Sequence, residues 1–130
     1  MRRYSKIGLE RRQKEREGYS DFYLRHISKI KTENLRCEEC NSKLIGNASE
    51  VAHVLPKNLY KSVATNDENV VYLCGFQSEN NCHSKFDNSS NKDYWNMFVF
   101  ELAKEKFNIL KEITTEKITY KTIDRVMGPD

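Results

Sequence analysis

The sequence predicts a small α+β domain that is stapled by a four-cysteine zinc site and flanked by helices at both ends. Two pairs of cysteines indicate this fold, together with two short strand-like segments between the pairs and helical apolar patterns outside them. The 130 residues are 38% hydrophobic and 32% charged, which suits one modest core. Because so small a core stabilises a fold weakly, an internal metal site would assist folding.

Residues 1–34 are predicted to form a basic N-terminal arm and a helix. The arm, residues 1–18, is polar and contains two glycines, so we expect it to be loosely helical at most. Ser20 is a candidate N-cap for a helix over residues 21–32. The apolar side chains of this helix share one face at helical spacing: Phe22, Tyr23, Ile27 and Ile30. His26, on the same helix, is interpreted as a surface or packing residue.

Positive charge is concentrated at the N-terminus. Residues 1–32 contain ten Lys and Arg against four Asp and Glu, although the whole chain carries a formal net charge of only +3. A basic arm on a nearly neutral body indicates an anionic partner, most commonly nucleic acid. The alternative is a solvated helix face, since the acidic residues of the segment dilute its charge.

The middle of the chain, residues 35–90, is predicted to form the zinc domain. Its expected elements are a Cys-x-x-Cys turn at 37–40, strands over 50–55 and 70–73, and a short helix that begins at 82. Pro56 ends the first strand because it cannot donate to a strand ladder. Asn69 opens the second strand, and Asn81 can cap the short helix.

Residues 91–130 are predicted to be a helical extension. Aromatic and aliphatic residues recur at helical spacing over 92–113, which predicts one long amphipathic helix. Thr119 is a candidate cap for a last helix that ends near Val126, before Gly128 and Pro129. The aromatic face of the long helix is interpreted as core or as a partner interface, with a homodimer as one option.

The four cysteines fit a zinc site better than disulfides. Zinc takes four thiolates in a tetrahedron, and we assign Cys37, Cys40, Cys74 and Cys82 as ligands of a structural zinc ion. Seven residues separate Cys74 from Cys82, where two to four are usual, and His83 is an alternative fourth ligand. Two disulfides are the other alternative, but the arginine-rich N-terminus lacks the apolar segment of a secretory signal.

The location predicted on the same grounds is the cytoplasm. We expect no membrane association, because the longest apolar run, about seven residues, is far short of the roughly 20 that span a bilayer.

The residues between the two cysteine pairs, together with those that follow Cys82, resemble the HNH endonuclease family. The His, Asn and His that give the family its name correspond here to His53, Asn69 and His83. Three segments carry the resemblance: Ala-His-Val-Leu-Pro at 52–56, Asn-Val-Val-Tyr-Leu-Cys at 69–74 and Cys-His-Ser-Lys-Phe-Asp at 82–87. They are similar to the first strand, second strand and closing helix of the family. The resemblance covers residues 35–90 and implies a ββα-metal core of the phage or mobile-element type. It also implies that the cytoplasm in question is that of a bacterium or a phage-infected host cell.

The resemblance also implies a chemistry, namely metal-dependent hydrolysis of DNA to a 5′-phosphate and a 3′-hydroxyl, with duplex DNA as the expected partner. His53 is expected to act as the general base, and Asn69 to orient the loop or the imidazole. His83 and Asp87, four positions apart on a helix, are expected to hold one catalytic divalent cation such as Mg²⁺.

One position departs from the family pattern. Many members carry a metal ligand immediately before the base histidine, and this chain has Ala52 there. The alternative function is therefore a catalytically inactive zinc-knuckle module that binds nucleic acid or a protein partner. For phosphate contacts the expected side chains are Lys57, Lys61 and Lys85, and solvated loop lysines are the alternative reading.

Overall fold

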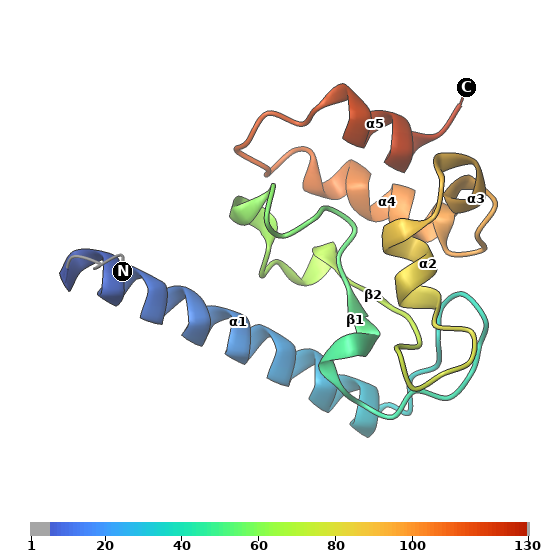
Figure 1. The fold of residues 1–130 in the computed structure, drawn as a ribbon, viewed down its shortest axis with the longest axis horizontal. Coiled ribbons are helices and arrows are strands. Elements are labelled where there is room, and N and C mark those ends of the chain that lie inside the picture. The colour runs from blue at the N-terminus through green and yellow to red at the C-terminus, as the bar shows by residue number, and fades with distance from the viewer. Residues whose placement is uncertain (1–5, 130) are drawn as a thin grey trace, which may run out of the picture.

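The computed structural model describes residues 6–129 (Figure 1). A long helix, α1 (Lys6–Thr32), runs along one side of the molecule, and its N-terminal half extends past the rest of the chain. A small sheet lies beside the other half of α1, and helices α3, α4 and α5 lie beyond the sheet. This combination of helices with a small antiparallel sheet confirms the α+β class. Residues 1–5 of the predicted basic arm lie outside the described residues.

The sheet has two short antiparallel strands, β1 (Val51–Ala52) and β2 (Val71–Tyr72). Val51 pairs with Tyr72 and Ala52 with Val71, and all four residues are buried. Both strands are shorter than predicted, and the chain enters β1 from a tight turn. The Glu50 carboxylate accepts hydrogen bonds from the N–H groups of Gly46 at 2.6 Å and Asn47 at 3.0 Å. Asn47 and Glu50 form a capping box around a single helical turn at Ala48–Glu50, so regular strand geometry begins only at Val51. The Glu50 carbonyl still accepts a hydrogen bond from Leu73 N at 3.0 Å.

The predicted division of the N-terminus into a loose arm and a helix that starts at Ser20 is wrong. One helix begins at Lys6 and contains Ser20 in its interior. Residues 9–17 are mostly Arg, Lys, Glu and Gln, which are strong helix formers, so the cost of about 1 kcal/mol at Gly18 does not end the helix. Residues 9–18 are exposed, whereas Phe22, His26 and Ile30 are buried at helical spacing and dock the second half of α1 onto the body.

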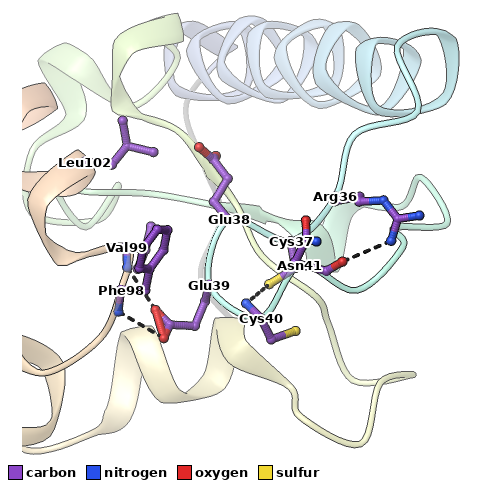
Figure 2. A pocket seen from close by; sticks show the side chains of 9 residues that line it. All are labelled: Arg36, Cys37, Glu38, Glu39, Cys40, Asn41, Phe98, Val99 and Leu102. Atoms are coloured by element: carbon purple, nitrogen blue, oxygen red, sulfur yellow. Dashed lines mark hydrogen bonds between the residues drawn. The ribbon is translucent and has the colours of Figure 1, made fainter.

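The single helix predicted over 92–113 is also wrong. Two helices are present, α3 (Asn91–Trp95) and α4 (Phe100–Leu110), with a turn between them. The Glu39 carboxylate accepts hydrogen bonds from the N–H groups of Phe98 at 3.0 Å and Val99 at 2.9 Å (Figure 2). Phe98 and Val99 directly precede α4, and an acidic side chain stabilises the N-terminus of a helix. Glu39, which is distant in the sequence, therefore sets this boundary.

Two other helices begin at the predicted caps. The side chain of Asn81 accepts a hydrogen bond from Ser84 N at the start of α2 (Cys82–Asn88). At the start of α5 (Tyr120–Met127), Thr119 Oγ1 accepts one from Thr122 N at 3.2 Å. One apolar cluster joins buried residues from all three predicted segments. No helix among residues 6–129 combines the length and the hydropathy that crossing a membrane requires.

Candidate functional site

Four cysteine thiols converge beside the sheet: Cys37, Cys40, Cys74 and Cys82. Their sulfur atoms all lie within 4.8 Å of one another, and all four are free thiols. Sulfurs at the corners of a zinc tetrahedron, about 2.3 Å from the metal, lie about 3.8 Å apart. The Cys40 and Cys74 sulfurs are 3.8 Å apart. This thiol cluster therefore could hold a metal ion, and its spacing is that of a metal site and not of a disulfide.

Backbone geometry holds the first cysteine pair in place. Asn41 adopts a positive φ of 65° and its N–H donates to the Cys37 carbonyl at 2.9 Å, which closes the turn. Cys40 N donates to Cys37 Sγ at 3.4 Å (Figure 2), and Cys82 N donates to Cys74 Sγ at 3.3 Å. Because these N–H groups point at sulfur, they favour the thiolate form that a metal requires.

Electrostatics make a cation necessary if all four thiolates are to form. Burial raises the pKa of the Cys37 thiol and, more strongly, that of Cys82, where the Cys74 thiol adds to the effect. Four negative sulfurs at this spacing repel one another unless a positive ion lies between them. The donor set thus fits zinc, which prefers thiolates in a tetrahedron. His83 is not among the residues of the cluster, so the cysteines alone complete the set.

A second site, the histidine cleft, lies where β1, α2 and α1 meet. Its volume is about 390 Å³ and its lining includes His53, His83, Asp87, Lys57 and Tyr23. The cleft therefore brings together two predicted metal ligands, the predicted base and one predicted phosphate contact. It is separate from the thiol cluster, although Cys82 and His83 are neighbours in the chain.

His53 directly follows β1, and a backbone carbonyl fixes its tautomer. His53 Nε2 lies 2.8 Å from the Ala64 carbonyl oxygen. Since a carbonyl only accepts, Nε2 carries the proton and the neutral ring has its lone pair on Nδ1. Burial lowers the pKa of His53, and the Ala64 bond opposes that shift. Phe22 of α1 packs against the ring at a centroid distance of 5.4 Å, so α1 helps to orient it.

His83 and Asp87 form a pair one helical turn apart on α2. His83 Nδ1 donates to the Ser49 carbonyl at 2.6 Å, which turns Nε2 toward the Asp87 carboxylate at 3.0 Å. The Asp87 contact raises the pKa of His83, because the carboxylate favours a proton on the ring. A divalent cation between Nε2 and the carboxylate would take the place of that proton. The backbone at Gly75 lies close to Ser49, whose carbonyl bonds His83. A Cβ atom at position 75 would clash with Ser49 Oγ, so the glycine permits this contact.

Asn69 is fully buried and joins two parts of the loop that precedes β2. Its Oδ1 accepts from Leu55 N at 2.7 Å, and its Nδ2 donates to the carbonyls of Leu55 at 3.0 Å and Val63 at 3.2 Å. Val63 is next to Ala64, whose carbonyl bonds His53. Asn69 is thus placed to act on the imidazole through the loop and not by direct contact.

The remaining predicted residues are not all brought to the cleft. Lys57 lines it, and its ammonium donates to Tyr23 Oη at 2.9 Å. Lys61 and Lys85 are exposed and do not belong to the cleft lining. Ala52 is fully buried in β1 and likewise supplies nothing to the cleft.

Sequence reasoning missed the groups that orient the histidines. The carbonyls of Ala64 and Ser49 give no sequence signal, because every residue has a carbonyl. The sequence pattern places Tyr23 on the apolar face of its helix, whereas in the structure its hydroxyl accepts a hydrogen bond from Lys57. Only the docking of α1 against the cleft reveals that role.

Comparison of the chain with protein-family models, with curated proteins and with solved structures finds no significant match. The functional assignment therefore depends on the residues and the geometry described above.

Proposed function

We propose that this chain is a metal-dependent endonuclease of the HNH type that hydrolyses DNA phosphodiester bonds. One observation carries the proposal: a histidine with its Nε2 proton bound to a carbonyl shares a cleft with a His–Asp pair on a neighbouring helix. The sequence resemblance, which was drawn from motifs alone, names the same residues.

His53 is the general base in this proposal. The Nδ1 lone pair accepts a proton from water while the water oxygen bonds to phosphorus. The bond from phosphorus to the 3′ oxygen then breaks, and the leaving oxygen takes a proton from solvent. A lowered pKa keeps His53 neutral, and so able to accept a proton, at neutral pH. Lys57 donates to the phosphate and fixes its position beside the base.

His83 and Asp87 are the proposed ligands of a catalytic divalent cation. When bound, such a cation would stabilise the negative charge that develops on the phosphate. Two protein ligands suffice for Mg²⁺, which commonly keeps several waters in its shell. The thiol cluster is proposed to bind a structural zinc ion, since its four ligands leave no position for substrate.

A second candidate function is a zinc-knuckle module that binds nucleic acid or a protein without cutting. Ala52 favours this candidate, because the position before the base contributes no ligand. The two candidates differ in two measurable properties, the occupancy of His83 and Asp87 by a divalent cation and the cleavage of DNA.

The test measures cation binding and plasmid cleavage together, on zinc-loaded protein. The parent is expected to bind one further Mn²⁺ ion and to nick supercoiled DNA. His53→Ala should keep the Mn²⁺ and lose cleavage, whereas His83→Ala should lose both. A zinc-loaded parent that binds no second cation and leaves the plasmid intact would exclude the endonuclease and favour the module.

A further inference from the structure

In the exposed half of α1, two arginines share one face and most of the acidic side chains lie on the opposite face. Arg12, Arg16, Tyr19 and Tyr23 follow one another at spacings of four, three and four residues, so they share one face. We call this face the Arg16 strip. A second set of residues lies on the opposite side of the helix. Each of its members precedes a member of the strip by two residues, which corresponds to a rotation of about 200° around the helix axis. That second set is acidic apart from one lysine: Glu10, Lys14, Glu17 and Asp21.

The Arg16 strip ends at the histidine cleft, because Tyr23 belongs to both. Tyr23 lines the cleft, and Tyr19 and Arg16 line a neighbouring hollow that also contains Arg12. From Arg12 to Tyr23 the helix rises about 16 Å. Successive phosphates of one strand rise about 3.4 Å along the axis of duplex DNA, so the strip equals the axial rise of roughly five nucleotides.

Lys57 connects the strip to the proposed site of cleavage. Its ammonium lies 5.2 Å from the ring centroid of Tyr23 and 5.7 Å from that of Tyr19. A cation over these rings is held in place, and one bond to Tyr23 Oη leaves two further N–H donors. Because the Lys57 ammonium lies over both rings, it competes with unpaired bases for them as stacking platforms. This favours a duplex, bound through its backbone, over a single strand.

We propose that the Arg16 strip binds the phosphate backbone of duplex DNA beside the histidine cleft and thereby sets the position of the duplex on the enzyme. The inference rests on the proposed function for its choice of DNA. The exposed face opposite the strip is acidic and would turn away from the duplex. Glu15 borders the strip in the same hollow, so it opposes phosphate binding there.

The test compares two variants that each remove one positive charge from the exposed helix. Arg16→Ala removes it from the strip, and Lys14→Ala removes it from the opposite face. Both place the best helix former at an exposed position, so neither is expected to unfold the protein. Binding of a fluorescent 20-base-pair DNA duplex is measured by anisotropy as a function of salt, in a His53→Ala background that leaves the DNA intact.

Arg16→Ala is expected to weaken binding about tenfold and to reduce the salt slope by about 1. Lys14→Ala should leave both within about twofold, and Glu15→Gln should tighten binding, since removal of a like charge has the opposite sign. Equal effects of Arg16→Ala and Lys14→Ala would overturn the strip, as would tighter binding to an RNA duplex of the same sequence.

Failure of the strip and failure of the endonuclease give different results. If the parent cuts plasmid and the two variants bind DNA alike, the strip is wrong and the enzyme remains. If the parent never cuts but Arg16→Ala alone weakens binding, the strip stands on a module that binds DNA without hydrolysis.

Discussion

At the scale of single residues, backbone carbonyls decide what the two histidines of the cleft can do. The Ala64 carbonyl holds the proton of His53 on Nε2, and the Ser49 carbonyl holds that of His83 on Nδ1. The same side-chain type therefore presents opposite nitrogens to the cleft. His53 offers Nδ1 as a base, while His83 offers Nε2 beside Asp87 as a ligand.

The pH dependence of cleavage tests the state of His53. Its pKa is lowered from 6.5 by burial and by the charges of Lys57 and His83, against the Ala64 bond and Asp87. Cleavage should thus be constant at neutral pH and fall only when pH drops through a value below 6.5, where the base becomes protonated. Single-turnover rates at saturating cation give this limb, and Lys57→Gln should shift it to higher pH. A limb at or above 6.5 in the parent would contradict the assignment.

At the scale of elements, the C-terminal segment supports the loop that carries Ala64. Tyr60 Oη donates to Thr122 Oγ1 at 2.8 Å and accepts from Thr119 N at 3.3 Å. The Glu116 carboxylate accepts from Ser62 N at 3.0 Å in the same loop. Although α5 lies outside the region that resembles the endonuclease family, it therefore takes part in positioning the proposed base.

Two tyrosine variants measure this support. Tyr60→Phe removes a buried hydroxyl that makes two hydrogen bonds and should lower the free energy of unfolding by about 1–2 kcal/mol. Tyr94→Phe is the matched control, because its buried hydroxyl has no hydrogen-bond partner among the described residues. The control should leave the stability unchanged or raise it. If chemical denaturation shows equal losses of unfolding free energy for the two variants, the hydrogen bonds of Tyr60 do not support the loop.

At the scale of the whole molecule, the thiol cluster joins segments that are distant in the sequence. It ties the turn at 37–40 to the end of β2 and the start of α2. Removal of the proposed zinc should leave either four thiolates that repel one another or thiols that have been reprotonated. In so small a core this loss should lower the melting temperature by more than about 10 °C. Calorimetry before and after chelation, with metal analysis, measures the change, and zinc should restore it. An unchanged melting temperature in metal-free protein would show that the cluster is not structural.

How far the sequence predicts this molecule depends on the range of the interactions involved. The thiol cluster and the caps at Asn81 and Thr119 were predicted, because their chemistry is written in adjacent or regularly spaced residues. The break between α3 and α4 was not, because Glu39 sets it from far away. The continuity of α1 was missed for a different reason, since a local cap signal at Ser20 was weighted above the helix propensity of the arm.

The cleft shows the same limit. Sequence order alone named the histidines, Asn69 and Asp87 as candidates, but it did not predict which nitrogen each histidine offers. It also did not distinguish Lys57, which lines the cleft, from Lys61 and Lys85, which do not. These differences arise from tertiary packing, chiefly from the docking of α1 against the cleft.

The most direct test of the central claim is the single-turnover rate at which supercoiled plasmid becomes nicked, measured for the parent and for His53→Ala at equal zinc content. We expect a metal-dependent rate for the parent and a loss of about 10²–10⁴-fold in the variant, the size expected for a general base. A variant that cuts as fast as the parent, with its fold and zinc intact, would contradict the assignment of His53 as the catalytic base.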